Sequence, residues 1–196
     1  MKIKKIFIIL LLFNINFSDV YSISPDVFVQ STVNRASQIL SKNISKKEKI
    51  EELKSVAKET VDIKGVGFYS LGLARKNLNI QQKTQYFDLF EKYFLKSFSS
   101  RLSEYTNPKI EVQGKEVLND NYTIVKSLLI GTAERPEVKI DWRVYTKNPN
   151  NPLIRDLIIE GLSLARTQKE EFTSILNSNS GDINALFKVL EEFSKN

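Results

Sequence analysis

Apolar residues in the first half of the chain recur every three or four positions, the spacing of helices that bury one face. The first such segment covers about 25–40. Its apolar positions are Val29, Val33, Ala36 and Leu40. A second segment begins at Ser45, which is placed to form a capping box with Glu48, and continues to about Val61. Asp62 can cap a third, so the pattern predicts three successive helices.

The strongest helical pattern runs from about Ile80 to Tyr105 and is rich in aromatic residues. One stripe consists of Phe87, Phe90, Phe94, Phe98, Leu102 and Tyr105, with Tyr86, Leu89 and Tyr93 beside it. Such a helix is typical of a protein core, where its rings pack against a sheet. Because large rings interdigitate less completely than Leu and Val, the same stripe can also line a cavity.

After Pro108 the pattern changes from helical to alternating, which is typical of β-strands. It predicts a strand at 110–113, a turn region from Gly114 to Asn121 and a second strand at about 122–131. Lys126 marks the outer face of that second strand. A third strand at 138–145 is the clearest half-buried strand of the sequence. Its inward residues are Val138, Ile140, Trp142 and Val144.

The stretch from Leu153 to Phe172 joins an apolar strand to an amphipathic helix. Apolar residues occupy both parities of this strand, with Leu153, Leu157 and Ile159 on one and Ile154 and Ile158 on the other. Both faces are therefore expected to be covered. The chain turns at Gly161, Ser163 is placed to cap the following helix, and a last helix starts near Gly181.

Four strands in succession predict an antiparallel meander, and helices on both sides of it in the sequence define an α+β fold. We therefore predict a four-stranded antiparallel curved sheet wrapped by about six helices. With 196 residues, of which 41% are hydrophobic, the chain is long enough for one sizeable core. Residues 23–196 are expected to form a single domain.

The first 22 residues have the three parts of a secretory signal peptide. They are a basic start at Lys2, Lys4 and Lys5, an apolar run at 6–13, and a small-residue cleavage site at Val20-Tyr21-Ser22. A transmembrane helix needs about 20 apolar residues, so a retained anchor is the less favoured alternative. We expect export and cleavage after about Ser22.

The chain contains no histidine and no cysteine. This composition removes the commonest general base, thiolate nucleophiles and most ligands for transition metals, so most enzyme classes are disfavoured. Cleavage of the signal would remove three lysines and one aspartate and lower the formal net charge from +6 to +4. Nucleic-acid binders usually concentrate positive charge in one stripe, whereas here it is spread along the chain. Binding of nucleic acid is therefore not expected.

Two sequence features superficially suggest catalysis. Ser163 lies in a segment similar to a nucleophile elbow, but Ala165 replaces the second glycine and no histidine is present to accept the proton. Asp141, Asp156 and Glu160 could supply a carboxylate pair across neighbouring strands. Solvated charges at a strand surface are the simpler interpretation of these three residues.

One segment resembles the signature of a known family. Residues 156–164, Asp-Leu-Ile-Ile-Glu-Gly-Leu-Ser-Leu, with Thr167, Gln168 and Phe172, resemble the D-hydrophobic-x-hydrophobic-E-G-hydrophobic-S-L motif of the MlaC / toluene-tolerance family of periplasmic phospholipid-binding proteins. A second match consists of Asp62-Ile63, Leu71-Gly72, Gln82 and the segment 87–90. The resemblance covers about 62–190.

The resemblance implies an NTF2-like, cone-shaped sheet with a lipid cavity between sheet and helices. It implies a soluble periplasmic carrier that shuttles phospholipid between the membranes of a Gram-negative cell and so maintains the lipid asymmetry of the outer membrane. The implied partners are an inner-membrane ABC transporter complex with an MCE-domain subunit and an outer-membrane lipoprotein complex. The carrier itself would be a monomer that catalyses no reaction and needs no metal or cofactor.

In this family context the expected lipid contacts lie on the aromatic helix, on the strands and on the neighbouring helices. They are Phe68, Leu71, Phe87, Phe90, Phe94, Val125, Leu129, Ile140, Trp142, Val144, Leu157, Ile159, Leu164 and Phe172. Arg75 and Arg143 are candidate cations at the rim. The family often has an aromatic residue where this sequence has Arg75, and an arginine where it has Lys169, so local contacts at the mouth are expected to differ.

Two other functions remain open from the sequence. The first is an NTF2-like enzyme that acts on an apolar small molecule, with Asp141 or Asp156 as the base. The second is a structural or hopanoid-related lipid-binding protein, because the family resemblance alone does not fix which lipid is carried.

Overall fold

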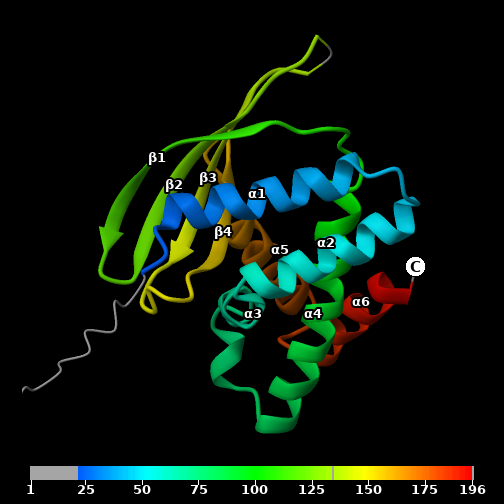
Figure 1. The fold of residues 1–196 in the computed structure, drawn as a ribbon. Coiled ribbons are helices and arrows are strands. Elements are labelled where there is room, and N and C mark those ends of the chain that lie inside the picture. The colour runs from blue at the N-terminus through cyan, green and yellow to red at the C-terminus, as the bar shows by residue number, and fades with distance from the viewer. Residues whose placement is uncertain (1–21, 134, 196) are drawn as a thin grey trace, which may run out of the picture.

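The structure is a computed structural model that describes residues 22–133 and 135–195. The predicted signal peptide, up to Tyr21, lies outside the described residues. Figure 1 shows a curved sheet on one side of the molecule and a group of helices on the other, with the first helix lying across the sheet. The fold is α+β, as predicted.

The three N-terminal helices form where the sequence pattern places them. They are α1 (Pro25–Ser41), α2 (Lys46–Thr60) and α3 (Ile63–Ser70), followed by a short 3₁₀ turn, η1 (Ala74–Lys76). The capping box of α2 is present, because the Ser45 side chain accepts from the Glu48 backbone N–H and the Glu48 carboxylate accepts from that of Ser45. Asp62 caps α3 by accepting from Gly65 N at 2.9 Å.

Three further helices complete the described helical part. They are α4 (Ile80–Leu102), α5 (Leu164–Ser178) and α6 (Ile183–Lys195). The predicted extension of α4 to Tyr105 is wrong, because the helix ends at Leu102 and Tyr105 is exposed beyond it. In residues 22–133 and 135–195 no helix has both the length and the apolar character that crossing a bilayer would require.

The described residues contain one antiparallel sheet of five strands in the order β1-β2-β3-β4-β5. The strands are β1 (Ile110–Asn119), β2 (Tyr122–Leu129), β3 (Val138–Tyr145), β4 (Leu153–Ile159) and β5 (Leu162–Ser163). The meander is therefore confirmed, but the predicted number of four strands is wrong. Glu160 and Gly161 both have positive φ, which is the requirement of a type I′ hairpin turn, so the chain pairs back on β4 before α5 begins.

Two further strand predictions are corrected by β-bulges. The turn region predicted from Gly114 is wrong, because β1 continues through Gly114 to Asn119 after a register shift against β2. In β4 a similar shift brings Ile154 and Leu157, which have opposite parity in the sequence, onto the same face opposite Val144 and Trp142. No residue of β4 is exposed, and Asp156 is buried on the outer face, so both faces are covered, as expected.

Helix α4 forms the centre of the helical layer. It packs against α2, α3 and α6, while α1 lies against β1 and β2 and α5 against β4. Helices α3 and α4 approach closely at Gly67, where an added Cβ would lie 2.7 Å from the Phe90 ring. Burial raises the pKa of the Tyr86 hydroxyl, which stays protonated and donates to the Gly67 carbonyl at 2.9 Å.

Candidate functional site

Most of the predicted lipid contacts lie together in the main hydrophobic core. Eleven of the fourteen belong to this one cluster. Seven are buried, namely Leu71, Phe90, Val125, Ile140, Trp142, Val144 and Phe172, and four are partly buried, namely Phe87, Phe94, Leu129 and Leu157. Ile159 is half-buried near the end of β4, whereas Phe68 and Leu164 are exposed. The structure thus brings residues of the aromatic helix and the strands into one core, and their contact with lipid stays a prediction.

The rings of α4 form a continuous aromatic row within this core. Phe90 lies 6.1 Å from Phe94 in a stacked arrangement, and Phe94 lies 5.7 Å from Phe98. Phe172 of α5 meets the Phe90 ring edge-on at 6.2 Å. Trp142 points inward from the sheet, as predicted, and its Nε1 donates to Ser127 Oγ at 2.8 Å.

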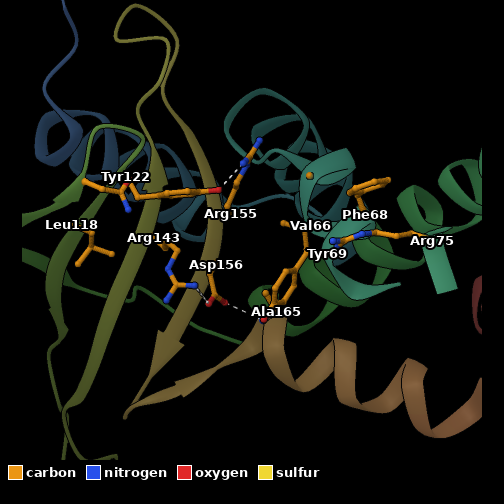
Figure 2. A pocket seen from close by; sticks show the side chains of 12 residues that line it. Val66, Phe68, Tyr69, Arg75, Leu118, Tyr122, Arg143, Arg155, Asp156 and Ala165 are labelled. Carbon is orange, nitrogen blue, oxygen red and sulfur yellow. Dashed lines mark hydrogen bonds and ion pairs between the residues drawn. The ribbon is translucent and has the colours of Figure 1, made fainter. Parts of the chain in front are cut away.

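A pocket of about 490 Å³ opens beside this core, between α3 and the sheet. Figure 2 shows Val66, Phe68 and Tyr69 on the helical side and Tyr122 and Arg143 on the strand side. The full lining is Gly65, Val66, Phe68, Tyr69, Arg75, Leu118, Asn119, Tyr122, Arg143, Arg155, Asp156 and Ala165. Val66 belongs both to this lining and to the hydrophobic core, so the pocket borders the core at this residue.

Arg155 of β4 fixes one wall of the pocket. Its Nε and one terminal nitrogen bind the Asp62 carboxylate at 2.7 and 2.6 Å, and its other terminal nitrogen donates to Tyr122 Oη at 2.6 Å. The guanidinium also lies 3.6 Å from the centre of the Tyr145 ring. Burial alone would lower the pKa of Arg155, but the hydrogen bonds that Arg155 donates to Tyr122 and Asp62 raise it, so this side chain stays charged.

Asp156 joins the sheet to the start of α5. Its buried carboxylate accepts from Ser163 Oγ at 2.6 Å and from Ala165 N at 2.9 Å, and lies 3.6 Å from an Arg143 nitrogen. Ser163 Oγ in turn accepts from Arg166 N, which confirms the predicted helix cap. A negative charge at a helix N-terminus is stabilised by the helix dipole. This network explains Asp156 and Ser163 as structural residues.

The two predicted rim cations both line the pocket. Arg143 is half-exposed on the strand side and is only loosely paired with Asp156. Arg75 lies on the opposite wall, where its guanidinium sits 4.9 Å from the centre of the Phe68 ring. The pocket therefore combines apolar side chains with arginines on two walls, an arrangement suited to an amphiphile with a negatively charged group.

Several pocket residues were not predicted from the sequence. Among the predicted lipid contacts in the described residues, only Phe68 lines the pocket. Tyr69, Leu118 and Tyr122 reach the pocket because β1 continues past Gly114 and α3 lies beside the sheet, and the sequence pattern predicted neither arrangement. Arg155 could have been identified from the sequence, because a charged residue inside an apolar strand requires a specific partner.

This fold and pocket define an α+β protein with an arginine-lined pocket next to a hydrophobic core. The family model described as "MlaC protein" matches residues 30–192, and the chain belongs to that family. A search of curated proteins finds no match. Among solved structures, the phospholipid-binding protein from Ralstonia solanacearum in complex with a phospholipid is similar, with a TM-score of 0.75 and 19% sequence identity. The likeness covers 88% of this chain and 98% of that one.

Proposed function

We propose that this chain is a periplasmic lipid carrier that binds phospholipid acyl chains and shuttles lipid between inner- and outer-membrane complexes, thereby maintaining outer-membrane lipid asymmetry. The observation that carries the proposal is the pocket that borders the hydrophobic core at Val66 and has arginines on two walls. Membership of the MlaC family and the similar fold of a protein in complex with a phospholipid support the same function.

The physical need for such a carrier follows from the cost of exposing lipid chains. A diacyl lipid has about 30 methylenes, and transferring each from water to an apolar site is worth about 0.8 kcal/mol. The chains would enter beside Val66, where the pocket borders the hydrophobic core. A pocket of about 490 Å³ lies within the usual range of ligand sites.

The proposed site explains why the chain would work as a carrier without catalysis. Asp156, one of the two candidate bases, accepts hydrogen bonds from Ser163 and Ala165 and lies 3.6 Å from an Arg143 nitrogen, so its oxygens already have partners. Asp141, the other, lies outside the pocket lining. The existing partners of Asp156 and the position of Asp141 support binding rather than catalysis.

The remaining parts of the proposal follow from the family. Residues 1–22 would direct export and be removed, leaving residues 23–196 as a monomeric carrier. An inner-membrane ABC transporter complex with an MCE-domain subunit and an outer-membrane lipoprotein complex would be its partners. Expression of the full chain in a Gram-negative host should yield periplasmic protein that begins at about Ile23, as read by N-terminal sequencing.

Native mass spectrometry of the gently purified protein tests lipid binding. The expected spectrum shows the polypeptide mass plus that of a phospholipid, which solvent extraction then releases for identification. A preparation that never carries lipid, even after incubation with phospholipid vesicles, would contradict the proposal. Extraction of a hopanoid instead would retain a carrier but change its cargo.

A further inference from the structure

The connection between α3 and α4 combines positive charge with exposed apolar side chains. The segment 63–87 contains four basic residues and no aspartate or glutamate, in a chain that has 23 acidic residues. Helix α2 differs, because its lysines alternate with glutamates and form ion pairs such as Lys54–Glu51 and Lys58–Glu91. The segment 63–87 is thus a locally cationic surface that attracts negative charge.

The same connection exposes two large apolar side chains to solvent. Leu71 and Leu78 are buried and anchor the loop in the core, whereas Leu73 and Ile80 are 79% and 81% exposed. A capping box between Asn79 and Gln82 fixes the start of α4 directly at Ile80. In Figure 1 this connection forms the lowest end of the molecule, away from the sheet. Its exposed apolar residues therefore project from a structured loop.

We propose that this surface docks the protein onto an anionic phospholipid membrane. The docking tip consists of Leu73, Lys76, Ile80 and Lys83. Large apolar side chains next to lysines are the chemistry of segments that lie in the interface of a bilayer, where the apolar groups enter the acyl boundary and the cations meet phosphate groups. Each lysine or arginine near an anionic membrane strengthens binding several-fold.

The position of the docking tip relates membrane contact to lipid binding in the pocket. Phe68, Tyr69 and Arg75, which flank it in the fold, line the wall of the pocket. Lys169 of α5 adds a further cation at this wall, with its Nζ 5.4 Å from the centre of the Tyr69 ring. Docking would place the pocket mouth against the head groups, so that a lipid need not cross bulk water. This purpose rests on the proposed function, whereas membrane binding by the tip does not.

Co-sedimentation with vesicles tests the inference with the full mature chain. The probe is phosphatidylcholine vesicles containing about one third phosphatidylglycerol, compared with pure phosphatidylcholine vesicles. We expect the wild type to bind the anionic vesicles. Leu73→Glu/Ile80→Glu and Lys76→Glu/Lys83→Glu should each lower the partition coefficient at least about tenfold. Circular dichroism checks that each variant is folded.

Two matched controls separate the tip from general surface effects. Val27→Glu changes another exposed apolar residue, on α1, and Lys188→Glu reverses an exposed charge on α6. Both should bind anionic vesicles within about twofold of the wild type. Equal loss in the controls and the tip variants would overturn the inference. So would tip variants that bind vesicles normally and instead fail to bind a partner protein, since the surface would then be a protein interface.

Lipid content distinguishes failure of membrane docking from failure of the proposed carrier function. Lipid content is measured by native mass spectrometry on the same tip variants, which should carry as much phospholipid as the wild type because none of their changed residues lines the pocket. A chain that binds anionic vesicles but never carries lipid would support docking while contradicting the carrier. A lipid-loaded chain that ignores anionic vesicles would overturn docking alone.

Discussion

Arg155 of β4 and Asp62, the N-cap of α3, form an ion pair in which the nitrogen and oxygen are 2.6 Å apart. The same Asp62 carboxylate accepts from Gly65 N through its other oxygen. One side chain therefore starts α3 and also fixes it to the sheet. Because α3 and the strands are the two walls of the pocket, this pair controls how far apart the walls lie.

Replacing Arg155 by methionine should lower the free energy of unfolding by about 2 kcal/mol, because the substitution leaves the partly buried Asp62 carboxylate without its cation. This value lies between those typical of exposed and of buried ion pairs. Urea unfolding followed by tryptophan fluorescence measures the change. Arg166→Met, which removes an exposed pair with Glu170 on α5, is the control and should cost less than about 0.5 kcal/mol. Equal effects of the two substitutions would show that Arg155 does not fix α3.

Leu118→Gln should lower the amount of co-purifying phospholipid at least about threefold, because it removes apolar surface from the pocket wall without adding charge. Leu118 is 47% exposed, so the fold should tolerate glutamine. Its neighbour Val117 is 71% exposed and does not line the pocket, which makes Val117→Gln the matched control. Native mass spectrometry compares the two. Full lipid content in Leu118→Gln would place the acyl chains elsewhere.

Arg143→Gln should weaken binding of a phospholipid about three- to tenfold and leave binding of an uncharged diacylglycerol unchanged. The reason is that hydrogen bonds to charged groups contribute more than neutral ones, and that Arg143 is only loosely held by Asp156. Displacement of a fluorescent lipid measures both affinities. Lys139→Gln, on the same strand but outside the pocket lining, serves as the control. An equal loss for both lipids would refute recognition of phosphate by Arg143.

The N-terminus of α1 should contribute a stability that depends on pH. The hydrogen bonds from Lys115, at 2.7 Å, and from Ser24 lower the pKa of Asp26 from 3.8 to about 2. A lowered pKa in the folded state means that the stabilisation is present above about pH 4 and is lost as the pH falls towards 2. The group is partly exposed, so we expect less than about 1 kcal/mol.

The measurement for Asp26 is the difference in unfolding free energy between the wild type and Asp26→Asn as a function of pH. The difference should be constant from pH 7 to about 5 and should shrink between about pH 4 and 2. Lys115→Met should remove most of this pH dependence. A difference that stays constant down to pH 2 would exclude the Asp26–Lys115 pair as its source.

Gly161→Ala should lower the free energy of unfolding by about 1–2 kcal/mol, because φ is +82° at this position and a side chain there is strained. Steric contact is not the cause, since an added Cβ meets no atom within 4 Å. Gly114→Ala is the control, because its surroundings are equally open and its φ lies outside the strained range. Thermal unfolding should therefore separate the two, with Gly114→Ala neutral or slightly stabilising.

Local chemistry explains which parts of the fold were predictable. The Ser45–Glu48 capping box, the Asp62 and Ser163 caps and the aromatic stripe of α4 depend on residues within a few positions of one another. The alternation of β3 likewise follows from one residue after the next. Bulges were missed because they arise only when two strands are paired, as at Gly114 and between Ile154 and Asp156.

The amino-acid sequence alone determined the class of fold, the family, the aromatic core and the absence of imidazole and thiol chemistry, because these depend on composition, local periodicity and a contiguous motif. Only the tertiary structure decided where a ligand pocket opens. Arg155 meets Asp62 and Tyr122 there across large separations in the sequence. Contacts of that kind depend on how helices and strands pack, and a sequence pattern does not give the distance in space between residues that are far apart in the chain.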